Sequence, residues 1–110
     1  MLKPGDVVTV EFPGVDGPKR RPAVVVSTEL YHRTRPDVIL GLLTSQAIAS
    51  TLPSDHVLRD WAAAGLNKPS VFRTFLATMP ATAFTLIGRL SDRDWQAVQR
   101  CLQLSLATSL

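Results

Sequence analysis

Three consecutive cations, Lys19, Arg20 and Arg21, stand directly before a proline and a run of small apolar residues. They end a segment rich in glycine and proline that separates two β-type runs, 7–12 and 22–27. This pattern predicts a hairpin that projects positive charge from a small β structure. Guanidinium and ammonium groups gathered in this way bind phosphate, so the first chemistry to expect is the recognition of nucleic acid.

Few other side chains suggest a reaction. The single cysteine, Cys101, excludes an internal disulfide, and cysteine and histidine nowhere have the spacing of a zinc site. We therefore expect neither a metal nor a cofactor. His32 and His56 fall where the pattern indicates a loop or a strand edge, and we expect both rings to be solvated.

The composition predicts one domain, 1–110, with a single hydrophobic core. Hydrophobic residues make up 45% of the chain, so we expect it to fold. The net charge of +3 suits a nucleic-acid partner, although nine arginines among twelve cations also fit a genome rich in GC codons. The beginning of the chain has no apolar secretory segment, and the apolar runs are too short to span a membrane. A soluble, cytoplasmic bacterial protein without a membrane partner is expected.

Six short runs have the character of β-strands. Residues 7–12 alternate in the way of a half-buried strand, and 23–26 are apolar on both faces, which predicts a central strand. The other expected strands are 37–43, 55–58, 70–76 and 84–90. We interpret 28–36 as a polar loop, 60–65 as one helical turn and 78–83 as turn-like.

A helix is predicted after Ser91, whose hydroxyl can cap a first turn that contains Asp92 and Asp94. The residues expected on its buried side are Trp95, Val98, Cys101, Leu102 and Leu106. Closely spaced strands followed by one amphipathic helix predict a mainly β fold with a C-terminal α-helix. We expect a small antiparallel β-barrel or strongly curled sheet, with the helix covering one open end.

Five blocks of the sequence, in order and across nearly its whole length, resemble the MazF/PemK/Kid toxins of bacterial type II toxin–antitoxin modules. The blocks are 5–8, 21–27, 37–40 running into 44–46, 64–73 and 87–91. The resemblance implies an SH3-like barrel of the MazF/Kid/CcdB type, a homodimer, and metal-independent endoribonuclease activity on single-stranded RNA. It also implies a cognate antitoxin whose tail occupies the RNA groove, with operator DNA as a further partner of the two proteins together.

The same resemblance assigns the catalytic roles. Arg21 occupies the position of the family's catalytic arginine, and Thr44 that of its active-site threonine. A guanidinium and a hydroxyl can both stabilise negative charge on a phosphate. Each residue also has an ordinary structural interpretation: Arg21 as a solvated turn cation, and Thr44 as a strand-end hydroxyl bonded to its own backbone.

The resemblance also implies further RNA contacts. Arg73 matches an RNA-contacting arginine, and its structural alternative is an edge residue that extends into solvent. Ser45 and Gln46 are expected to touch RNA beside the active-site threonine. Lys19 and Arg20 would add diffuse phosphate contacts that depend on salt.

The sequence also departs from the family's pattern. Phe75 stands where some relatives have an acid that is proposed to transfer a proton, and the histidine or glutamine of a longer first loop is absent. Asp16 is the one carboxylate in the short loop, and it is a weak catalytic candidate against the alternative of an Asp-Gly turn. The residue that acts as general base is therefore unassigned.

The expected function is that of a toxin that cleaves messenger RNA with some sequence selectivity. One alternative is a catalytically decayed member that binds only its antitoxin and operator DNA, as Phe75 and the short loop suggest. A second is a gyrase poison on the same fold. Such relatives depend on a terminal Trp-Gly-Ile, whereas this chain ends Ala-Thr-Ser-Leu, so the sequence disfavours that alternative.

Overall fold

A computed structural model describes residues 1–12, 17, 19–46 and 48–108. Its strands are β1 (Asp6–Phe12), β2 (Lys19–Val25), β3 (Asp37–Thr44), β4 (Asp55–Val57), β5 (Val71–Pro80) and β6 (Thr85–Arg89). Its helices are α1 (Glu29–Thr34), the short 3-10 helix η1 (Ala81–Ala83) and α2 (Asp92–Ser105).

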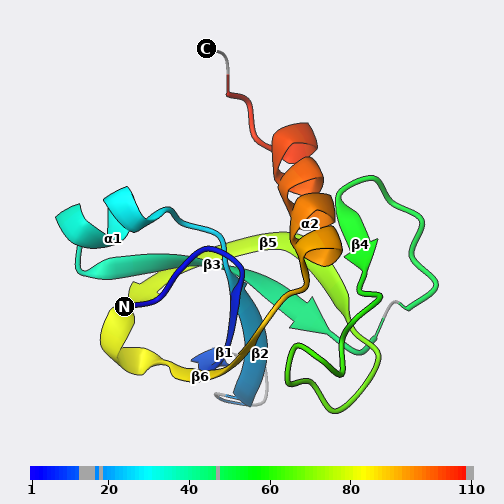
Figure 1. The fold of residues 1–110 in the computed structure, drawn as a ribbon, viewed down its shortest axis with the longest axis horizontal. Helices are drawn as coiled ribbons and strands as arrows, with labels where there is room; N and C mark the ends of the chain where they lie inside the picture. Colours follow the sequence, from blue (N-terminus) through cyan, green and yellow to red (C-terminus); the bar gives the residue numbers. More distant parts are fainter. Residues whose placement is uncertain (13–16, 18, 47, 109–110) are drawn as a thin grey trace.

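The six strands form one antiparallel sheet in the order β4-β5-β3-β2-β1-β6. Figure 1 shows this sheet strongly curled, with α2 standing beside β4 and β5. The predicted mainly β fold with a C-terminal helix is confirmed. In the sheet as described, the edge strands β4 and β6 do not pair with each other, so the curl does not close into a complete barrel.

Both faces of the sheet bury apolar side chains. Successive residues of a strand point to opposite faces, so Val7 and Val24 join one cluster, whereas Val8 and Ala23 join the other. The first cluster includes residues of α2; its buried members are Val7, Val24, Leu43, Leu58, Ala64, Leu66, Phe72, Leu90, Val98 and Cys101. The second comprises Val8, Val10, Ala23, Val25, Val38 and Leu40. Each fully buried valine or leucine contributes roughly 1.5–3 kcal/mol.

A close approach in the middle of the sheet requires Gly41. A Cβ at this position would lie 2.3 Å from the Phe72 ring. The register between β3 and β5 shifts at the same place: Gly41 pairs with Leu76, and the next residue of β3 pairs with Arg73. Two residues of β5 are therefore left without partners on β3, which makes a bulge that turns Phe75 toward solvent, 61% exposed.

The first turn of α2 is bound to the segment after β4 by two carboxylates. Ser91 caps the helix, as predicted, and accepts from the Asp94 N–H. Asp94 is completely buried and accepts from the His56 ring (2.8 Å), the Arg59 N–H (3.0 Å) and the Asp60 N–H (2.8 Å).

The second carboxylate, Asp60, receives a bidentate bond from Arg93, with both distances 2.7 Å, and one from Ser91 at 2.6 Å. The Arg93 and Ser91 bonds hold the pKa of Asp60 well below its usual value. Burial alone raises the pKa of Asp94, but the Arg59 N–H, the His56 ring and the Asp60 N–H outweigh it, so its pKa is also lowered.

Several sequence-based expectations were wrong. The segment 28–36 contains α1, because Thr28 caps a first turn with Glu29, and basic residues follow at its end. β5 continues to Pro80 because Thr78, Met79 and Pro80 pair with β3, so only η1 remains of the predicted turn.

The two histidines and the end of α2 also differ from expectation. His32 is half-buried between the Ser27 hydroxyl and the Leu2 carbonyl oxygen, and His56 is held by Asp94, so neither ring is freely solvated. Leu106 lies just past α2 and is exposed rather than buried. Among the described residues, α2 is the longest helix, and it is too short and too polar to cross a membrane.

Acid should weaken the attachment of α2. Because the pKa values of Asp60 and Asp94 are lower in the folded chain than in the unfolded chain (about 3.9), their stabilisation is complete above that pH and is lost as the pH falls below it. Asp94→Asn should reduce this pH dependence and lower the free energy of unfolding near neutral pH by about 1–3 kcal/mol. The NH2 group of asparagine would face a buried N–H, and two donors cannot form a hydrogen bond. Denaturant unfolding at several pH values measures both.

Asp92→Asn is the matched control, because Asp92 is exposed in the same turn and accepts no hydrogen bond from a described side chain. It should cost under about 1 kcal/mol. Equal stability and equal acid sensitivity of the Asp94 and Asp92 variants would contradict the role given to Asp94.

Candidate functional site

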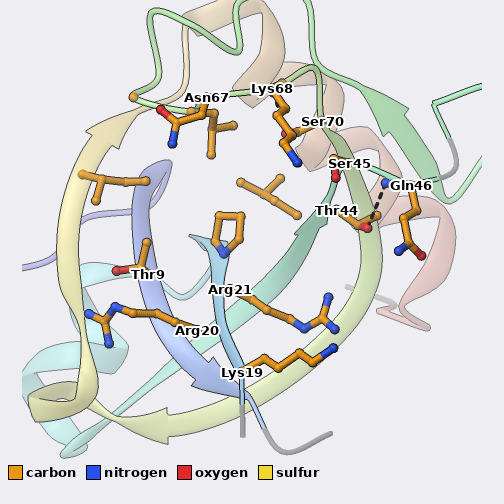
Figure 2. Close-up of a pocket in the computed structure, with 15 residues that line it drawn as sticks. Thr9, Lys19, Arg20, Arg21, Thr44, Ser45, Gln46, Asn67, Lys68 and Ser70 are labelled. Carbon is orange, nitrogen blue, oxygen red and sulfur yellow. Dashed lines mark hydrogen bonds between the residues drawn. The ribbon is translucent and has the colours of Figure 1, made fainter. Parts of the chain in front are cut away.

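A groove opens between the start of β2, the end of β3, and the loop that precedes β5 (Figure 2). Its volume is about 460 Å³, which falls in the usual range of small-ligand pockets. Its polar lining residues are Thr9, Lys19, Arg20, Arg21, Thr44, Ser45, Gln46, Asn67, Lys68 and Ser70. Its other lining residues are Pro22, Leu43, Gly65, Leu66 and Ile87.

The groove begins where the pairing of β2 with β3 ends. Ala23 and Leu42 are the last pair of this ladder. If the register continued for two more residues on each strand, Arg21 would face Thr44. The strands instead separate, while β2 stays paired with β1 and β3 stays paired with β5. Arg21 and Thr44 therefore lie on two diverging strands that flank the same groove.

Pro22 gives a physical reason for this separation. The Val26 N–H donates to the Ile39 carbonyl oxygen of β3 at 3.0 Å. Backbone N–H groups along an antiparallel strand point alternately to its two neighbours, so position 22 also faces β3. Proline has no N–H, and the bond that this position would donate to Leu43 cannot form. The ladder therefore ends at Ala23, two residues after the cation Arg21.

The three cations of β2 do not point the same way. Figure 2 shows Lys19 and Arg21 extending to one side of the strand and Arg20 to the other, as strand alternation requires. Arg20 donates to the Thr85 hydroxyl of β6 at 2.6 Å. Within the described part of the chain, the Arg21 guanidinium has no hydrogen-bond partner.

Thr44 ends β3 with its hydroxyl oriented by the following turn. The Gln46 N–H donates to Thr44 Oγ1 at 3.2 Å, the strand-end arrangement that the structural interpretation of the sequence anticipated. This bond uses the oxygen as an acceptor, so the hydroxyl hydrogen remains able to donate to a ligand. Ser45 and Gln46 are exposed beside it.

The opposite wall is a loop that presses against β6. Gly65 has φ +88°, and a Cβ there would lie 2.3 Å from the Ile87 carbonyl oxygen. A Cβ at Gly88 would lie 2.1 Å from the Ala64 carbonyl oxygen. Only glycine permits this contact of backbone with backbone. It fixes the loop whose next residues, including Asn67, line the groove.

The charge of the lining has one sign. Lys19, Arg20, Arg21 and Lys68 contribute four cations, and none of the described lining residues is acidic. Such a surface attracts a polyanion and holds it by phosphate contacts. The described lining also lacks histidine, so it offers side chains that stabilise negative charge but no group that titrates near neutral pH.

One sequence-based candidate, Arg73, and the departure from the family's pattern at Phe75 lie elsewhere. Arg73 is on β5, exposed, with its Nε 3.5 Å from the Asp55 carboxylate, and it is absent from the groove lining. Phe75, the residue that replaces the acid of some relatives, projects from the β5 bulge, also away from the lining. Asp16 lies outside the described residues. The groups that the structure brings together from the sequence-based set are Lys19, Arg20, Arg21, Thr44, Ser45 and Gln46.

The sequence did not indicate four of the polar lining residues: Thr9, Asn67, Lys68 and Ser70. The signal available for the last three was the place of these polar residues around Pro69, shortly after Gly65, a composition typical of a surface loop. Across the ranges that the model describes, no three acidic, histidine or cysteine side chains gather as metal ligands would.

Comparison with known families gives one match over most of the chain. The model of PemK-like, MazF-like toxins of type II toxin–antitoxin systems matches residues 3–106. Among curated proteins, the comparison finds no match.

Solved structures give strong matches in fold. A mycobacterial endoribonuclease in complex with its cognate antitoxin has a TM-score of 0.81 at 17% identity, with 100% of this chain and 99% of that chain covered. MazF in a MazE–MazF crystal structure from Deinococcus radiodurans has a TM-score of 0.74 at 21% identity, with 98% and 97% covered. The Mycobacterium tuberculosis toxin MazF-mt6 has a TM-score of 0.69 at 20% identity, with 93% and 99% covered. At these identities the likeness shows a shared fold.

If Pro22 keeps the groove open, replacing it should let the ladder grow. Pro22→Val supplies an N–H that faces β3, and we expect the amide at this position to exchange with solvent at least tenfold more slowly than an exposed amide. The free energy of unfolding should change by less than about 1 kcal/mol. The added hydrogen bond offsets the greater conformational entropy that valine, compared with proline, gives the unfolded chain. Hydrogen exchange followed by NMR measures this protection. Pro53→Val, in an exposed turn, is the control. If the new amide at position 22 exchanges with solvent as fast as the new amide at position 53, the explanation is refuted.

Proposed function

The chain belongs to the family of PemK-like, MazF-like toxins of type II toxin–antitoxin systems, and we propose that it is a metal-independent endoribonuclease that cleaves single-stranded RNA. The observation that carries this proposal is the placement of Arg21 and Thr44 on diverging strands that flank a groove whose described lining is cationic and free of acids. Cleavage of messenger RNA by such an enzyme would stop translation and growth.

The proposed reaction needs charge stabilisation above all. The ribose 2′-oxygen attacks phosphorus, the bond to the 5′-oxygen breaks, and the products carry a 2′,3′-cyclic phosphate and a 5′-hydroxyl. The pentavalent transition state gains negative charge on its non-bridging oxygens. Arg21 would hold two of these oxygens with its planar fork, and the Thr44 hydroxyl would donate to one of them. Both are catalytic residues in this proposal.

The neighbouring polar residues would hold the strand. Lys19, Arg20 and Lys68 supply charge for adjacent phosphates, and Ser45 and Gln46 supply hydrogen bonds near Thr44. Arg73 would touch RNA outside the groove, because its side chain is 45% exposed even while it faces Asp55. No cofactor enters this scheme.

The reaction also requires two proton transfers. The 2′-hydroxyl must lose a proton and the leaving oxygen must gain one. The described lining holds neither histidine nor carboxylate, and Asp16, a weak candidate, lies outside the described residues. This deficit favours one alternative function, that of a decayed member that binds its antitoxin and operator DNA without cutting RNA.

Partners are proposed from the family and from the structural neighbours. The mycobacterial endoribonuclease and the MazF of Deinococcus radiodurans were both solved with an antitoxin. We propose a cognate antitoxin that competes with RNA for the groove, a homodimer of this chain folded as one domain over 1–110, and joint binding of operator DNA. The proposed compartment is the bacterial cytoplasm, where messenger RNA is available.

The purified protein should cut mixed-sequence RNA in the presence of a chelator. Arg21→Ala should lower the rate by roughly 100- to 1,000-fold, the usual effect of removing a donor that stabilises transition-state charge. Arg33→Ala, an exposed cation on α1, is the matched control and should keep the wild-type rate. Mass spectrometry should find cyclic phosphate ends. Intact RNA with the wild-type protein would reject nuclease activity and leave the binding-only alternative.

Binding should weaken steeply with salt if four cations meet phosphates. For single-stranded RNA the slope of log K against log salt is about −0.7 per phosphate contact, so a value near −3 is expected. Lys68→Ala should make the slope shallower by about 0.7, whereas Arg33→Ala should not change it. Fluorescence anisotropy with a fully 2′-O-methylated strand, which lacks the nucleophile, measures this without cleavage. A slope near zero would mean that the groove does not bind phosphate.

A further inference from the structure

We propose that Asn67 reads one base of the bound RNA and so determines part of the sequence preference of cleavage. The inference rests on the proposed nuclease function and adds a specificity-determining residue to it. It comes from the wall of the groove that faces β2, where the sequence indicated no functional residue.

The two walls of the groove carry different chemistry. The β2 side presents the cations Lys19 and Arg21, which suit the phosphate backbone. The loop side presents the amide of Asn67, and Figure 2 shows its nitrogen directed toward the groove and its oxygen toward the side of β6. A nucleotide whose phosphate lies against β2 would therefore turn its base toward the loop.

The backbone around Asn67 is fixed from both directions. On one side, Leu66 is 9% exposed in the first core cluster, and Gly65 is pressed against β6. On the other side, Ser70 is buried and its hydroxyl donates to the Lys68 carbonyl oxygen at 2.9 Å. A reading group must be held in place to discriminate between bases. Gln46, across the groove, has one more side-chain torsion, and the bond that its N–H donates to the Thr44 hydroxyl is longer, at 3.2 Å, than the bond that holds Ser70.

The side chain of Asn67 has the chemistry that base reading needs. An amide carries donors and an acceptor side by side, and such a pair matches the edge of one base better than the others. Bases in single strands are recognised by their exposed edges. Asn67 is exposed, and its amide makes no hydrogen bond to any side chain or backbone group in the described ranges. Its neighbour Lys68 offers charge without an acceptor, which suits affinity more than discrimination.

The test is to map cleavage sites in a random RNA pool by sequencing the ends, for wild type, Asn67→Ala, Asn67→Asp and Lys68→Ala. Asn67→Ala should reduce the base preference at one position near the cut by roughly tenfold, and leave the other positions unchanged. Asn67→Asp should shift that position toward guanine, whose Watson–Crick edge offers two adjacent donors to a carboxylate. Lys68→Ala should slow cutting of all sequences and leave the preferences intact.

The outcomes separate this inference from the function on which it rests. If the wild type cuts RNA and both Asn67 variants keep its preferences, the base-reading role is wrong and the nuclease proposal stands. If the wild type cuts no RNA, both are wrong. A preference that changes in Lys68→Ala as much as in Asn67→Ala would also overturn the assignment, because the effect would then belong to the loop and not to the amide. Thermal unfolding checks that each variant is folded.

Discussion

The missing N–H of Pro22 is the constraint on which the groove depends. It falls at the position of β2 that faces β3, and the pairing of these strands ends at the next residue, Ala23. Two strands that diverge within a curled sheet leave a space between them, and the register places Arg21 and Thr44 on its two sides. In a fully paired ladder, the backbone N–H and C=O groups of the two strands would bond to each other. The open ladder instead leaves polar groups free to meet a ligand.

The opposite wall is positioned from a distance by α2. Asp94 receives the backbone N–H groups of Arg59 and Asp60, which lead into the turn at 61–65. That turn ends at Gly65, which rests on β6 and presents the loop to the groove. A helix that lies outside the groove lining thus holds one of its walls through a buried carboxylate. This arrangement depends on two residue types: a buried carboxylate at position 94 and a glycine, which has no Cβ, at position 65.

Local patterns predicted much of this fold, and contacts between distant residues decided the rest. Alternation predicted β1, a run apolar on both faces predicted β2, and the Ser91 cap predicted the start of α2. The cap at Thr28 was equally readable, but the polar residues after it resembled a loop. The β5 bulge and the partners of His56 could not be predicted, because they depend on register and on which elements meet. The role of Pro22 is of the same kind: the residue is visible in the sequence, but the strand that its nitrogen faces is not.

We propose that the space between β2 and β3 binds the sugar–phosphate strand of RNA. The most direct measurement is an NMR titration of the protein with a fully 2′-O-methylated single-stranded RNA, following every assigned amide signal. We expect the largest shifts at Arg21, at Thr44 and in the loop that contains Asn67, with little change in α1. Shifts confined to α1 or to the outer face of α2, or no shift at low salt, would contradict it.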